Sequence, residues 1–165
     1  MTPEEFLAQA EQRLAANKYA VERITLRGVP AVVGRRKPFR VRWFLTQLKA
    51  SVVVCAVPEV TQQGWLEFVG EATQIARGFP GGLPNGLQSG FGAVPVLAAT
   101  AVDPGAAAVA HGSKPPVEWF GGVCTPGLVD LTQRQAYAFG GKQVVGAVYF
   151  PFLRKQRDLV TSIVR

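Results

Sequence analysis

The stretch SVVVCAVPEVTQQGWLEFVGEATQIARG, residues 51–78, decides the fold of this chain. Its first part, 51–57, is an almost unbroken run of small and β-branched apolar residues, which is typical of a strand buried on both faces. Thr61 then stands where a helix N-cap is expected, and Gly78 can end the helix. Between them an apolar stripe follows helical spacing: Trp65, Phe68, Val69, Ala72, Ile75 and Ala76. The stretch therefore predicts a buried strand followed by a helix that packs against it.

Elements of both kinds flank this unit. Thr2 and Glu5 have the spacing of a capping box, with Pro3 at the first helical position, which predicts a helix over 2–17. Strands are expected at 19–27, 31–35, 39–45, 93–102 and 144–150, and a hairpin is expected of 117–123 with 128–131. Helices are expected from Asp103 to Gly112 and from Pro151 onward, and a short helical turn is one alternative for 132–139. This order predicts an α+β fold in which residues 1–165 form one domain, with helices packed on a mixed, largely antiparallel β-sheet.

A basic stretch lies upstream, from Arg23 to Phe44. Seven of the 18 Lys and Arg residues fall between positions 23 and 42, and no acidic residue follows Glu22 in the stretch. Because strand side chains alternate, a meander would bury one face and display guanidinium groups, which suit carboxylates and phosphates, on the other. The predicted binding face consists of Arg23, Arg27, Arg35, Arg36, Lys37, Arg40, Arg42 and Phe44, the last as a stacking surface. The alternative is that 35–37 form a solvated turn and the other arginines pair with nearby Glu residues.

The composition fits a globular protein with an acidic partner. Hydrophobic residues make up 48% of the chain, and the net charge of +7 favours nucleic acid, an anionic surface or an acidic protein, with plain solubility as the alternative. Cys55 and Cys124 lie in apolar surroundings, which favours buried thiols and a reducing compartment. We find no signal peptide and no apolar run of about 18 residues. We therefore expect a cytoplasmic protein without a membrane span.

Residue types that carry catalysis are scattered along the chain. Cys124, His111 and Asp130 have the chemistry of a thiol-nucleophile triad, but their spacing cannot place them together. His111 is the only histidine, and at the end of a predicted helix it would complement the helix dipole. Two cysteines and one histidine give no zinc pattern, and the Gly-rich loop 78–92 lacks the Lys and Ser or Thr of a P-loop. We expect no catalytic residue, no metal and no cofactor.

The order of helix, strands, capped helix, strand and Ala-rich helix over residues 2–112 resembles an Mrr-type restriction-endonuclease-like domain. The helix from Thr61 with Phe68, the segment 95–100 and the Ala-rich segment 106–110 look like the second half of that family. The family places an acid on one strand and, on the next, an acid or Gln, one residue and then Lys. The residues Gln47, Leu48 and Lys49 match this short pattern, but they precede the predicted strand and no matching acid stands upstream. The resemblance implies a nuclease-like scaffold without its catalytic set.

These observations predict a non-enzymatic binding or adaptor protein whose basic sheet face docks an acidic partner. The partner would be an acidic protein segment in a larger assembly, or nucleic acid. The alternatives are a divergent restriction-endonuclease-like nuclease and a thiol hydrolase that uses Cys124 and His111. Several large hydrophobic residues would suit a homo-oligomer or partner interface, although burial in the core is expected for most of them: Trp119, Phe120, Tyr149, Phe150 and Phe152.

Overall fold

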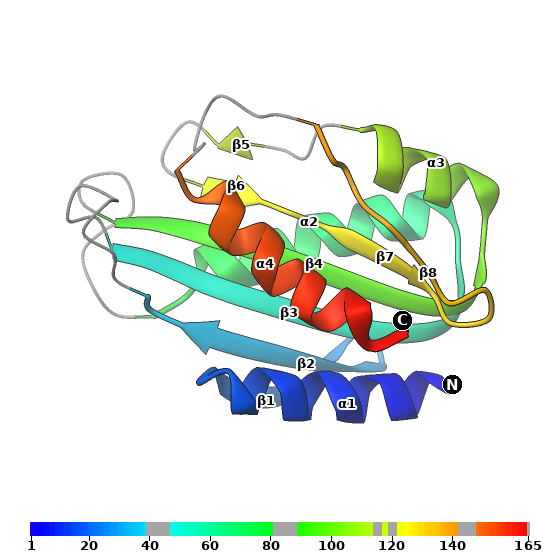
Figure 1. Cartoon of the computed structure of the whole chain (residues 1–165), viewed down its shortest axis with the longest axis horizontal. Helices are drawn as coiled ribbons and strands as arrows, with labels where there is room; N and C mark the ends of the chain where they lie inside the picture. The colour runs from blue at the N-terminus through cyan, green and yellow to red at the C-terminus, as the bar shows by residue number, and fades with distance from the viewer. Residues whose placement is uncertain (39–46, 81–88, 114–116, 119–121, 142–147, 165) are drawn as a thin grey trace.

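The computed structural model describes residues 1–38, 47–80, 89–113, 117–118, 122–141 and 148–164. In these residues four α-helices pack on one eight-stranded sheet, which confirms the predicted α+β class (Figure 1). The helices are α1 (Pro3–Ala16), α2 (Gln62–Arg77), α3 (Pro104–Gly112) and α4 (Phe150–Thr161), the last followed by a 3-10 turn, Ser162–Val164. The strands are β1 (Ala20–Leu26), β2 (Val29–Arg36), β3 (Gln47–Val60), β4 (Ser89–Val102), β5 (Val117–Glu118), β6 (Gly122–Cys124), β7 (Gly127–Asp130) and β8 (Gln135–Tyr137).

The sheet is built around the long parallel pair of β3 and β4. On one side of this pair β1, β2 and β3 form an antiparallel meander. The register of the parallel pair runs from Gln47 opposite Ser89 to Val60 opposite Val102, and α2 lies in the connection between the two strands. On the other side β6 and β7 both run parallel to β4, and each has a short antiparallel neighbour, β5 and β8. The sheet is therefore mixed, with four antiparallel and three parallel pairings among the described strands.

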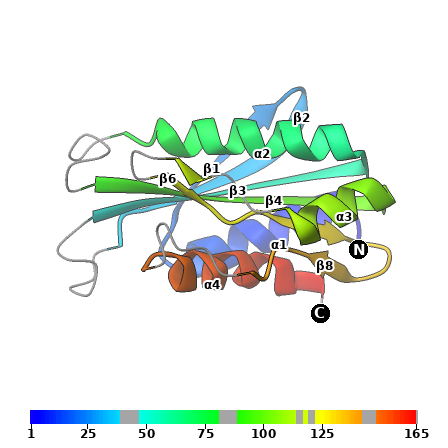
Figure 2. The ribbon, with the colours of Figure 1, turned by 90° about the horizontal axis from the view of Figure 1, so that it is seen from above.

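Helices cover both faces of the sheet, with α2 on one face and α1 and α4 on the other (Figure 2). Because successive side chains of a strand point to opposite faces, β3 contributes to both halves of the core. Val52 and Val54 pack in the cluster under α1 and α4, whereas Val53 and Cys55 pack in the cluster under α2 and α3. The predicted contact of α2 with β3 is confirmed, and α2 also packs on β4. Trp65, Phe68 and Ala72 are buried in this cluster as predicted, whereas Ile75 is only half-buried.

Each of the first three helices begins at the residue that the sequence predicts. The hydroxyl of Thr2 accepts from the Glu5 amide at 3.1 Å, and the Glu5 carboxylate accepts from the Thr2 amide at 2.8 Å. The hydroxyl of Thr61 accepts from the Gly64 amide at 3.1 Å, and the carboxylate of Asp103 caps α3 in the same way. These caps satisfy N–H groups that the first turn of a helix leaves without a partner.

Some predicted boundaries are wrong. The strand predicted at 51–57 is only the centre of β3, and β4 begins at Ser89, so the end of the Gly-rich loop is strand. The predicted hairpin around Pro126 is absent: β6 and β7 follow one another along β4 in the same direction, because Pro126 interrupts the ladder without reversing the chain. Residues 132–134 form a turn, and Phe150 begins α4 instead of ending a strand. The strand predicted at 39–45 lies outside the described residues.

Most of the hydrophobic residues considered for an interface are accounted for. Phe150 and Phe152 are buried under the sheet, and Tyr149 packs against the same cluster. Trp119 and Phe120 lie outside the described residues. Within the described part of the chain, no helix is both long enough and apolar enough to cross a membrane.

Candidate functional site

Two of the arginines of the predicted binding face lie on opposite faces of the sheet. Arg23 donates from its Nε to Glu11 of α1 at 2.9 Å, so its guanidinium lies on the α1 face. Arg27 occupies the turn between β1 and β2, where its Nε donates to Glu71 of α2 at 2.5 Å and its Nη1 donates to Glu67. The structure therefore does not bring Arg23 and Arg27 together, and both positive charges already have carboxylate partners.

A third arginine of the basic stretch is paired in the same way. Arg35 donates from its Nη1 to Glu22 of β1 at 2.6 Å. The pairing with nearby Glu residues, which the alternative interpretation of the sequence predicts, is therefore found for Arg23 and Arg27. Arg35, which that interpretation places in a solvated turn, lies in β2 and pairs with Glu22 instead. Arg40, Arg42 and Phe44 lie outside the described residues.

The last two described cations of the stretch lie at the end of β2 and contact aromatic rings. The guanidinium of Arg36 lies 5.9 Å from the ring centroid of Tyr19 and donates to a carbonyl of the turn between α1 and β1. The ammonium of Lys37 lies 5.4 Å from the ring centroid of Phe79. Lys18 is exposed in the same α1–β1 turn. Within the described part of the chain none of these three cations forms an ion pair, and two of them, Arg36 and Lys37, belong to the predicted basic face.

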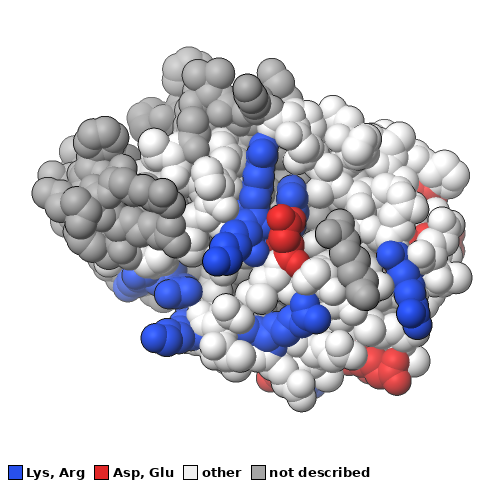
Figure 3. Space-filling view, in the orientation of Figure 1, with Lys and Arg blue, Asp and Glu red and all other residues white. Residues whose placement is uncertain are grey.

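Further basic side chains lie on the face that carries α1 and α4, where Lys and Arg are more widespread than Asp and Glu (Figure 3). Arg154, Lys155 and Arg157 of α4 contribute to this face, and Arg157 pairs with Asp158 at 2.9 Å. Arg13 of α1 donates to a carbonyl and a hydroxyl at the end of α4, at 2.9 and 2.8 Å. Arg13 therefore links α1 to the end of α4, whereas the ion pair of Arg157 lies within α4.

The three residues of the hypothetical thiol triad do not meet. Cys124 lies opposite Ala93 of β4 and Asp130 lies opposite Ala99, so about 20 Å of strand separates them. The buried carboxylate of Asp130 accepts two backbone N–H groups of the following turn, at 2.9 and 2.8 Å, which is a structural role. His111 is exposed in the last turn of α3. The geometry therefore offers no support for a thiol hydrolase.

The short pattern that carried the nuclease resemblance lies within a strand. Gln47, Leu48 and Lys49 open β3 instead of preceding it, and Lys49 is buried. The β2 residues nearest in register, Arg35 and Arg36, are basic, so β2 supplies no acid beside this pattern. Among the residues that the structure describes, no group of three or more His, Cys, Asp or Glu side chains could hold a metal ion.

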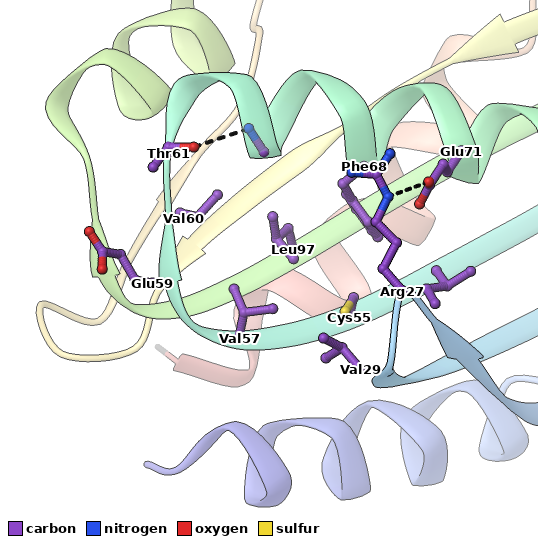
Figure 4. A pocket seen from close by; sticks show the side chains of 12 residues that line it. Arg27, Val29, Cys55, Val57, Glu59, Val60, Thr61, Phe68, Glu71 and Leu97 are labelled. Carbon is purple, nitrogen blue, oxygen red and sulfur yellow. Dashed lines mark hydrogen bonds and ion pairs between the residues drawn. The ribbon is translucent and has the colours of Figure 1, made fainter.

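A pocket with apolar walls and polar ends is the best-formed candidate site (Figure 4). It has a volume of about 280 Å³ and lies between the β1–β2 turn, β3, β4 and α2. The ion pair of Arg27 with Glu71 lies at one end, and Glu59 and Thr61 lie at the other. The apolar walls come from Leu26, Val29, Cys55, Val57, Val60, Phe68 and Leu97.

Two regular spacings produce this lining. On β3, Cys55, Val57 and Glu59 alternate with residues of the other face, so all three line the pocket under α2. On α2, Thr61, Gly64, Phe68 and Glu71 follow a three-four spacing and face the same space. Because Gly64 has no side chain, the first turns of the helix leave room above β3.

Arg27 has an unusual backbone for its residue type. It and Gly28 form a two-residue turn in which both have positive φ, 50° and 80°, a conformation that favours Asn or Gly. An arginine there costs on the order of 1 kcal/mol, and its contacts with α2 offset this cost. The hydrogen bonds that Arg27 donates to Glu67 and Glu71 raise the pKa of Arg27, and the first of them lowers the pKa of Glu67. The turn therefore holds the positive charge of Arg27 between two carboxylates at one end of the pocket.

The thiol on the floor of the pocket is not an activated nucleophile. Burial, with a smaller contribution from the nearby charge of Glu71, outweighs a backbone hydrogen bond at Ala56 and raises the pKa of Cys55 to about 11. The thiol donates to the carbonyl of Pro30 at 3.7 Å. Because the thiolate is the nucleophilic form, Cys55 is a neutral, apolar lining residue at pH 7.

Comparison with known proteins identifies no relative: no protein-family model, no curated protein and no solved structure matches the chain. The pocket is therefore assigned from its geometry.

Proposed function

We propose that this chain is a non-enzymatic binding protein that holds a small, mainly apolar molecule between the β1–β2 turn, β3 and α2. The observation that carries this proposal is the pocket with apolar walls and charged groups confined to its ends. Such sites bind through burial of apolar area, while a few polar groups fix the orientation of the ligand. The volume of about 280 Å³ is close to twice that of a cavity of about 150 Å³ that holds one benzene ring. A ligand with two fused rings matches this size.

The chemistry of the lining supports binding more than catalysis. The thiol of Cys55 is neutral, no histidine lines the pocket, and Arg27 and Glu71 are engaged with one another. Cys55 and Cys124 are buried and form no disulfide, which supports a cytoplasmic location for this activity.

Filling the pocket tests this function. We expect Val57→Phe to lower the affinity for 1-naphthalenemethanol at least tenfold, because Val57 is half-buried and its longer replacement would extend into the ligand space. The measurement is a titration of ligand fluorescence or heat. Val21→Phe is the matched control, since Val21 is also a half-buried strand valine but packs on the α1 side. The proposal would be contradicted if the unmodified protein did not bind 1-naphthalenemethanol, or if the unmodified protein and Val57→Phe bound it with equal affinity.

A second candidate retains the acidic partner and places it at the end of β2. The observation that favours it is that Lys18, Arg36 and Lys37 form no ion pair within the described part of the chain, unlike Arg23. Arg40 and Arg42 follow shortly after in the sequence and lie outside the described residues.

Salt dependence tests this second candidate. If Arg36 and Lys37 neutralise phosphates of duplex DNA, Arg36→Ala/Lys37→Ala should reduce the slope of log affinity against log salt by up to about 1.8, from about 0.9 per contact. Arg23→Ala should leave the slope unchanged, because that charge is already paired with Glu11. An acidic protein should show the same sensitivity to the double variant. If the double variant bound duplex DNA as tightly as the unmodified protein does, and bound the acidic protein equally tightly as well, this surface would be ruled out as the binding site.

A further inference from the structure

We propose that the ligand of the pocket carries a cationic group, such as a protonated amine attached to a ring system of two fused rings. This inference rests on the proposed function of the pocket and adds the charge of its ligand. It follows from the charges at the pocket ends. Glu59 and Glu71 line the pocket, Arg27 is the one cation of the lining, and Arg27 also pairs with Glu67, which lies outside the lining. The two carboxylates and one guanidinium of the lining give a local sum of −1.

The hydrogen bonds at the mouth favour a ligand cation over a ligand anion. Arg27 uses its Nε for Glu71 and its Nη1 for Glu67, so a ligand carboxylate bound to the remaining N–H groups of Arg27 would lie close to both carboxylates and be repelled by them. An ammonium group is not repelled by these carboxylates. Only one oxygen of Glu71 accepts a hydrogen bond from the described residues, and the second is available to a donor.

The local charge opposes the charge of the whole molecule. The chain carries +7, which would attract anions from a distance. At physiological ionic strength the field of exposed charges decays over about 8 Å, so the carboxylates at the pocket determine which head group is stabilised there. The electrostatic influence of Glu71 also extends to the pocket floor, where it acts on the Cys55 thiol. The pocket therefore selects against the acidic ligands that the overall composition favours.

Three probes of equal ring size test this inference: 1-naphthalenemethylamine, 1-naphthalenemethanol and 1-naphthoic acid. At pH 7 and physiological ionic strength we expect the amine to bind about three- to fivefold more tightly than the alcohol, and the acid to bind most weakly. Glu71→Gln should remove most of the difference between amine and alcohol. Glu67→Gln is the matched control, because it removes an equal charge from α2 that contacts Arg27 but does not line the pocket. It should retain most of that difference.

The possible results of this experiment distinguish a failure of this inference from a failure of the proposed function on which it rests. Equal affinity for the amine and the alcohol, or tightest binding of the acid, overturns the cationic ligand while leaving the pocket function intact. A preference that survives Glu71→Gln also overturns it. If none of the three probes binds, the pocket function fails and the inference fails with it. Thermal unfolding of both Gln variants verifies that each remains folded. A loss of binding can then be attributed to the lost charge and not to unfolding.

Discussion

Phe68→Ala should lower the free energy of unfolding by about 3 to 5 kcal/mol, the range for removing a large aromatic side chain from a core. Phe68 is 7% exposed and packs in the cluster of α2 with β3. It also borders the pocket, so its removal would enlarge an existing void that the surrounding side chains cannot close. Urea denaturation followed by circular dichroism measures the change.

Leu66→Ala provides the control for this substitution. Leu66 lies two residues away on the same helix but is 52% exposed, so its removal should change the unfolding free energy by less than about 0.5 kcal/mol. If Phe68→Ala and the unmodified protein had the same urea denaturation midpoint, the packing of α2 on β3 would be contradicted.

The second large effect is expected where α4 crosses the sheet. A Cβ atom on Gly92 would lie 2.7 Å from Cδ2 of Leu153, which is fully buried. Gly92→Ala should therefore cost about 1 to 3 kcal/mol through overpacking, and Leu153→Ala about 2 to 5 kcal/mol through the cavity it leaves. Because the new methyl group would occupy part of that cavity, the double variant should lose less stability than the sum of the two single changes.

Gly70→Ala separates this close contact from the general effect of replacing glycine. Gly70 is exposed on α2 and no atom lies within 4 Å of a Cβ built on it. Alanine there should stabilise the protein by about 0.5 to 1 kcal/mol, because alanine favours helix. Strictly additive free energies for Gly92→Ala and Leu153→Ala would show that α4 does not press on β4 as described.

The parts of the fold that could be predicted are those determined by residues close together in the sequence. Thr2, Thr61 and Asp103 each stand before an apolar stripe and cap a helix as expected. The segment around Pro126 could not be predicted in the same way, because a proline fits a hairpin turn and an interrupted edge equally well. Which of the two occurs depends on the long-range pairing with β4, and that pairing has no local signal.

The candidate site was predicted less well, and the reason lies in one backbone angle. Val21, Arg23 and Arg27 have the same parity in the sequence, so strict alternation places both arginines on one face. β1 ends at Leu26, and the positive φ of Arg27 directs its side chain to α2 instead. The pocket was missed altogether, because its lining comes from separate segments whose apolar residues are indistinguishable in sequence from ordinary core residues.

The two halves of the core close at different moments of synthesis. All the fully buried residues of the α2 half, including those at the pocket, lie between Ala31 and Leu128. The other half joins Phe6 and Leu14 of α1 to Leu153 and other residues of α4. Since a chain emerges from the ribosome with its N-terminus first, α1 can pack on β2 and β3 well before α4 is made. The ligand-binding half can therefore form before α4 emerges, whereas the other half is completed only when α4 packs beside α1.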